Sequence, residues 1–78
     1  MNSQELTAQQ RAVFRWVKEF IREKGWPPTR KEIATQFGFA SPNAAECHLR
    51  ALHRKGALRV GAGGARRIAV NDAYQGRA

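Results

Sequence analysis

The sequence has few of the features that mark secreted, membrane or metal-binding proteins. It contains a single cysteine, so Cys47 has no partner for an internal disulfide and no second thiol for a zinc site. No apolar run approaches the roughly 18 residues that span a membrane, and the start lacks the cationic flank and apolar stretch of a signal peptide. We therefore expect a cytoplasmic protein with no membrane contact, no metal and no other cofactor.

Acidic residues are scarce, especially in the second half of the chain. Lys and Arg number 14 against six Asp and Glu, which gives a formal charge of +8. No acidic residue lies between Glu46 and Asp72, where the cations are Arg50, Arg54, Lys55, Arg59, Arg66 and Arg67. Such a surface attracts polyanions, nucleic acid first among them. The alternative is a solvated basic face that serves only solubility.

The size and composition predict one small folded domain. The chain has 78 residues, and its hydrophobic fraction of 42% is enough for a packed core. We expect the domain over residues 1–70 and a flexible tail over residues 71–78, because the tail shows no periodicity.

The first predicted helix begins at Thr7, which forms a capping box with Gln10, and ends at Gly25. Apolar residues recur between these limits at helical spacing, with charged residues among them: Val13, Trp16, Val17, Phe20 and Ile21. The "WPP" stretch that follows favours extended backbone. One face of this helix should therefore be buried.

Two further helices are predicted close together. "TRKE" is a second capping box, and the helix that it starts places Ile33, Ala34 and Phe37 inward and stops at Gly38. Ser41 then caps a third helix, with Pro42 at its first position, which runs to about Lys55. Two helices joined by a short turn that contains glycine are typical of the helix-turn-helix unit.

Two short alternating runs, "ALRV" and "RIAV", flank the glycine-rich "GAGGA" and predict a two-stranded hairpin. The expected fold class is therefore mainly α: a winged helix-turn-helix with three helices and a C-terminal β-hairpin wing.

The third helix has one apolar and one polar side. Ala45, Leu49 and Leu52 share the first, and the other carries Asn43, Glu46, Cys47, Arg50 and Arg54. Asn can form two hydrogen bonds with adenine, and Glu can accept one from the cytosine amino group. Arg can donate two hydrogen bonds to guanine or to a phosphate. We expect this face to enter the major groove of double-stranded DNA, although the same polar residues are compatible with an ordinary solvated helix.

Contacts with the DNA backbone are expected from cations and from the start of the second helix. Free N–H groups at a helix start favour an anion beside a cationic side chain. The candidates are Thr29, Arg30, Lys31, Arg50, Arg54, Arg66 and Arg67. For each cation the alternative is a fully hydrated side chain.

Two stretches, "LTAQQRAVF" and "PPTRKEIATQFGFASPNAAECHLRALHRKGALR", closely resemble the amino-terminal DNA-binding domain of the LexA repressor family of the bacterial SOS response. The resemblance implies a winged helix-turn-helix without cofactor that binds a palindromic operator as two half-sites in the bacterial nucleoid. The base-reading positions that it implies are Ser41, Asn43, Ala44, Glu46 and Cys47. Family members of this motif type carry a second Glu where this chain has Cys47, so the cytosine contact of that carboxylate is lost here.

The resemblance predicts a transcriptional regulator, most simply a repressor. The sequence offers no apolar heptad and no second helix pair for a constitutive dimer, so we expect a monomer that forms a homodimer on DNA. We expect no small-molecule ligand. The self-cleaving domain of the family has no counterpart in these residues, so we expect no enzyme activity. Two other interpretations remain. One is a protein-interaction winged helix anchored by Trp16 and Trp26, or an accessory module that acts with a LexA-like partner. The other, an enzyme using adjacent Cys47 and His48, is disfavoured because neighbouring helix residues point about 100° apart.

Overall fold

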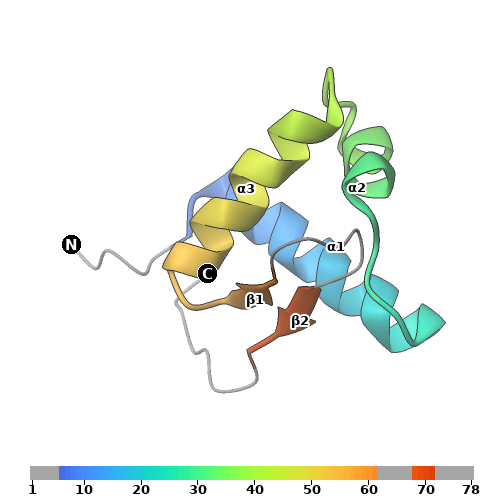
Figure 1. The fold of residues 1–78 in the computed structure, drawn as a ribbon, viewed down its shortest axis with the longest axis vertical. Coiled ribbons are helices and arrows are strands. Elements are labelled where there is room, and N and C mark those ends of the chain that lie inside the picture. The colour runs from blue at the N-terminus through green and yellow to red at the C-terminus, as the bar shows by residue number, and fades with distance from the viewer. Residues whose placement is uncertain (1–5, 62–67, 72–78) are drawn as a thin grey trace.

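The computed structural model describes residues 6–61 and 68–71. In chain order the elements are α1 (Ala8–Lys24), α2 (Arg30–Phe37), α3 (Pro42–Arg54), β1 (Leu58–Val60) and β2 (Ile68–Val70). Figure 1 shows α3 crossing over α1, with α2 beside the start of α3 and the hairpin beside its end. The predicted fold class, a mainly helical winged helix-turn-helix, is confirmed.

Both predicted capping boxes form. At the start of α1, the Gln10 N–H donates to the Thr7 hydroxyl and the Thr7 N–H donates to the Gln10 side chain, each at 3.1 Å. The same exchange joins Thr29 and Glu32 at the start of α2. Each box satisfies backbone donors that the first turn of a helix leaves without partners, so the two helices begin where the sequence predicts.

The turn between α2 and α3 depends on one left-handed residue. Gly38 has φ +69°, a conformation that side chains with a Cβ rarely adopt, and the next N–H, of Phe39, donates to the Ala34 carbonyl. Ser41 occupies the N-cap of α3 as predicted, with Pro42 after it, but its side chain makes no capping hydrogen bond. The Ser41 hydroxyl is thus exposed at the tip of the turn.

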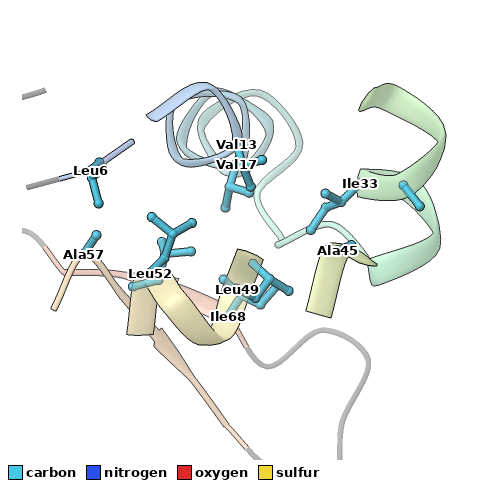
Figure 2. Packing of buried hydrophobic residues seen from close by; sticks show 11 residues of the cluster. Leu6, Val13, Val17, Ile33, Ala45, Leu49, Leu52, Ala57 and Ile68 are labelled. Atoms are coloured by element: carbon cyan, nitrogen blue, oxygen red, sulfur yellow. The ribbon is translucent and has the colours of Figure 1, made fainter. Parts of the chain in front are cut away.

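The core forms where α3 crosses α1 and meets α2 (Figure 2). Ala45, Leu49 and Leu52 are all fully buried, which confirms the predicted apolar face of α3. They belong to one cluster with Val13, Val17, Ile33, Leu58 and Ile68, so every element contributes to it. Burial of this face fixes the opposite, polar face of α3 toward solvent.

A row of aromatic ring contacts, packed against the core, supports the turn. Trp16 of α1 makes an edge contact with Phe37 of α2, Phe37 stacks on Phe39, and Phe39 stacks on His48 of α3, with centroid separations of 5.9, 5.7 and 5.0 Å. Ring pairs at these distances add attraction beyond their buried area. The row connects all three helices and restrains the angle between α2 and α3.

The two strands pair antiparallel, with Leu58 opposite Val70 and Val60 opposite Ile68. Asn71 closes the base of this hairpin, because its backbone N–H donates to the Ala57 carbonyl and its side chain donates to the Gly56 carbonyl. The predicted glycine turn, apart from Gly61, lies outside the described residues, as do Arg66 and Arg67 and residues 72–78 of the predicted tail.

Candidate nucleic-acid interface

The polar face of α3 starts at the turn after α2, at the tip of the molecule in Figure 1. Ser41, Asn43 and Cys47 are exposed there, while Ala44 and Glu46 are partly buried. All five predicted base-reading positions therefore remain at least partly exposed to solvent. The buried face of the same helix holds this polar face in place.

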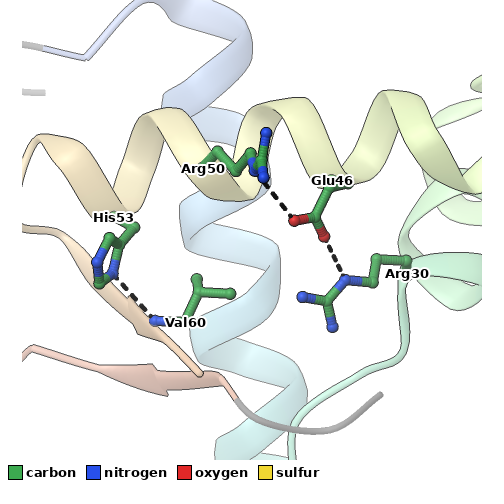
Figure 3. Close-up of polar contacts among 5 residues, drawn as sticks. All are labelled: Arg30, Glu46, Arg50, His53 and Val60. Carbon is green, nitrogen blue, oxygen red and sulfur yellow. Dashed lines mark hydrogen bonds and ion pairs between the residues drawn. The ribbon is translucent and has the colours of Figure 1, made fainter. Parts of the chain in front are cut away.

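Glu46 is enclosed by two arginines from different elements (Figure 3). Arg30, at the first position of α2, donates from Nε to Glu46 Oε1 at 2.5 Å. Arg50, one turn further along α3, lies with its Nε 3.4 Å from Oε2. The sequence predicts that Glu46 contacts DNA bases and that Arg30 contacts DNA phosphates. In the structure the two side chains form an ion pair with each other.

The start of α2 presents a different set of groups. The Thr29 hydroxyl accepts the capping bond from the Glu32 N–H, which leaves its own proton available as a donor. Lys31 is exposed, whereas Arg30 is only partly so. Of the two neighbouring cations, Lys31 is thus the one that faces solvent.

A cavity of about 340 Å³ lies between α3 and the start of the wing. It is lined by Glu46, Arg50, His53, Arg54, Val60 and Gly61. Arg50 and Arg54 are the two arginines among these residues. Arg59 on β1, which does not line the cavity, is exposed to solvent. The polar face of α3 therefore continues into a basic groove at the foot of the wing.

One side chain that sequence reasoning passed over connects α3 to the wing. The Val60 N–H donates to His53 Nδ1 at 3.1 Å (Figure 3). An acceptor Nδ1 requires the neutral ring with its proton on Nε2. No local sequence signal indicates this contact, because it depends on how the chain returns after Gly56.

We expect His53→Ala to loosen the wing without unfolding the domain. The Val60 N–H loses its side-chain acceptor, and because the site is exposed, water replaces much of that bond. The expected loss of stability is about 0.5 kcal/mol, at the low end for a hydrogen bond. Amide exchange should accelerate at Val60, and Arg54→Ala, an exposed truncation next to it, should leave the Val60 rate unchanged. Equal Val60 exchange rates in the two variants would contradict the hydrogen bond between the Val60 N–H and His53.

Cys47 and His48, the adjacent residues of the enzyme interpretation, have different surroundings in the structure. The Cys47 thiol is exposed, while the His48 ring stacks on Phe39 at an interplanar angle of 16°. The position of His48 is explained by packing against the turn. None of the helices in residues 6–61 is long and apolar enough to cross a bilayer.

Fold and surface together define a winged helix-turn-helix domain whose last helix exposes a polar, cation-flanked face. In such domains this helix is the element that enters the major groove.

Comparison with known proteins identifies the family. Residues 3–67 match the model of the LexA DNA-binding domain, and the chain belongs to that family. It is 49% identical over 73 residues to the LexA repressor of Halorhodospira halophila, covering 94% of this chain and 32% of that protein. It is 54% identical over 71 residues to the LexA repressor of Burkholderia cenocepacia, covering 87% of this chain and 33% of that protein. The chain thus spans about a third of the length of these relatives, and the matching part is a DNA-binding rather than a catalytic domain.

Proposed function

We propose that this protein is a sequence-specific transcriptional repressor that binds double-stranded DNA and inserts α3 into the major groove of a palindromic operator. The observation that carries the proposal is the exposure of Ser41, Asn43 and Cys47 on a helix whose opposite face is fully buried. A rigidly held polar face can read base edges, because each base pair presents its own pattern of donors and acceptors in that groove. Occupation of the operator would then exclude polymerase.

Each residue of the face receives a chemical role. Asn43 is suited to bond adenine bidentately, Glu46 to accept from the cytosine amino group, and Ala44 to contact a thymine methyl. The Ser41 hydroxyl, which makes no capping bond, is available as donor or acceptor. Cys47 offers only a weak donor and a weak acceptor, so we expect little selectivity at the base it faces.

Backbone contacts are assigned to the cations around this face. Thr29 and Lys31 lie at the start of α2, where the positive end of the helix dipole favours an anion. Arg50 and Arg54 border the groove beside α3. Arg66 and Arg67, outside the described residues, would extend the contacts along the duplex.

We further propose that two copies pair on DNA. A single small module typically buries about 600–1,000 Å² of its surface on DNA, which supports only modest affinity. Two copies on adjacent half-sites would share the recognition, and a palindromic site would follow from their two-fold relation.

Selection of bound duplexes from a random pool tests this function. The selected sites should contain an inverted repeat, and log K should fall linearly with log salt by about 0.9 for each phosphate contacted. A pool that stays random after several rounds at moderate salt would refute sequence-specific binding. Selected sites without symmetry would refute pairing on DNA while leaving recognition by one copy intact.

One observation favours protein binding as a second candidate function. Trp26, after α1, is 52% exposed, and exposed aromatic residues are common anchors of protein interfaces. Trp16, the other predicted anchor, contacts Phe20 and Phe37 instead. Under this alternative Trp26→Ala abolishes binding to a LexA-like partner and leaves duplex selection unchanged.

A further inference from the structure

We propose that Arg30 is a positioning residue for base recognition: it holds and neutralises the Glu46 carboxylate so that this group can approach DNA. This inference rests on the proposed function of α3. It changes the role of Arg30 from the phosphate contact that its place at the start of α2 suggests.

Arg30 and Glu46 lie 16 positions apart in sequence, on the two helices that flank the turn, and their side chains meet at 2.5 Å. Their side chains are only 20% and 30% exposed. Screening by water and salt is weaker for a partly buried pair than for an exposed one. The contact therefore restricts the rotamers of Glu46 before DNA arrives.

Arg50 makes a longer and more exposed contact with Glu46 than Arg30 does. Its Nε lies 3.4 Å from the other Glu46 oxygen, and its side chain is 72% exposed. Exposed ion pairs of this kind hold weakly. Arg50 can therefore turn to a phosphate or a guanine while Arg30 stays on the carboxylate.

A lone carboxylate that enters the major groove is repelled by the phosphates on both sides, because DNA carries one negative charge per about 1.7 Å of its axis. A carboxylate paired with Arg30 brings no net charge. It also keeps acceptor capacity, because an ionised carboxylate has about four lone-pair sites and these ion pairs occupy only part of them. The cytosine amino group can donate to one that remains.

The two roles of Arg30 predict different binding data, and Lys31 is the natural comparison. Removal of a phosphate contact weakens binding to all duplexes alike and lowers the salt slope by about one unit. Removal of a positioning residue instead lowers the ratio of specific to non-specific affinity. Lys31 is adjacent and exposed, so Lys31→Met reports what the loss of one cation at the start of α2 does by itself.

The experiment measures dissociation constants of five proteins on three duplexes. The proteins are the wild type, Arg30→Met, Lys31→Met, Glu46→Ala, and the double variant with Arg30→Met and Glu46→Ala. The duplexes are the selected site, the same site changed at the base pair whose preference disappears in Glu46→Ala, and a scrambled sequence. Thermal unfolding of each protein verifies that the variants are folded, and Arg30→Gln, which also removes the charge, replaces Arg30→Met in all measurements if Arg30→Met is unfolded.

We expect Arg30→Met to lower discrimination between the first two duplexes by about tenfold, the size of one good base contact. Lys31→Met should weaken binding to all three duplexes by the same factor. In the double variant, discrimination should equal that of Glu46→Ala alone, because Arg30 acts through Glu46. In the free protein, the NMR signal of the Arg30 Nε–H should exchange faster with water once Glu46 is replaced by Ala.

The possible results distinguish a failure of the positioning role of Arg30 from a failure of the proposed DNA-binding function. If the wild type binds the selected and scrambled duplexes equally, the proposed function fails and the inference falls with it. If the wild type discriminates but Arg30→Met and Lys31→Met behave alike, only the positioning role is overturned. Additive losses in the double variant, or unchanged discrimination in Arg30→Gln where it replaces an unfolded Arg30→Met, would also overturn it.

Discussion

Truncation of Leu49 to alanine is expected to lower the free energy of unfolding by about 2–5 kcal/mol, through lost burial and the cavity left behind. Leu49 is fully buried at the centre of α3, in the one cluster that joins all five elements. A domain of this size has a total stability of about 4–12 kcal/mol. The midpoint of thermal unfolding should fall by on the order of 10–30 °C.

Leu49→Met is the matched control, since it keeps the volume and apolar character of the side chain. We expect it to cost under about 1.5 kcal/mol. Circular dichroism during heating, with chemical denaturation at 25 °C, measures both variants. Similar midpoints for Leu49→Ala and the wild type would mean that α3 is not held by this cluster, and the fixed orientation of its polar face would lose its basis.

The helix limits and the buried face could be predicted because local chemistry decides them. Thr7 and Thr29 each form a capping box with a residue three positions later, and Gly38 adopts the left-handed conformation that ends α2. A pattern that spans one turn of helix contains all the atoms of the interaction. The burial of Leu49 followed from periodicity for the same reason, because a helix places every third or fourth residue on one face.

Two contacts of the candidate site, Arg30–Glu46 and His53–Val60, could not be predicted because they join residues from separate elements. The Arg30–Glu46 pair depends on the angle between α2 and α3, which the Phe37, Phe39 and His48 rings help to restrain. The Ser41 side chain shows that a local prediction can also fail. Its type and place predict a capping bond, and the residue does occupy the N-cap, but the hydroxyl makes no such bond. Local preference thus gives the position of a cap more surely than the use of its side chain.

The proposed recognition of DNA uses residues that the local sequence pattern places and residues whose contacts join separate elements. Asn43 and Cys47 are placed by the periodicity of α3 alone, and both are exposed as expected. Glu46 sits on the same face, but its charge is shared with arginines of two elements. Under the proposed function, specificity at Asn43 would therefore depend on one side chain, whereas specificity at Glu46 would depend on the folded helix pair. Asn43 is for this reason the cleaner test of base reading.

Asn43→Ala is expected to reduce discrimination between the selected and scrambled duplexes by about 1–3 kcal/mol, or roughly five- to 150-fold. The amide is the group suited to a bidentate adenine contact, and its exposure means that the fold loses little when it is removed. Gln9→Ala, which truncates another exposed amide on α1, controls for general effects and should leave discrimination unchanged. Competition binding at two salt concentrations measures the effect: the salt slope should stay constant, because no phosphate contact is lost. A variant that lost the same factor on every duplex would place Asn43 against the DNA backbone and remove α3 from the role of base reader.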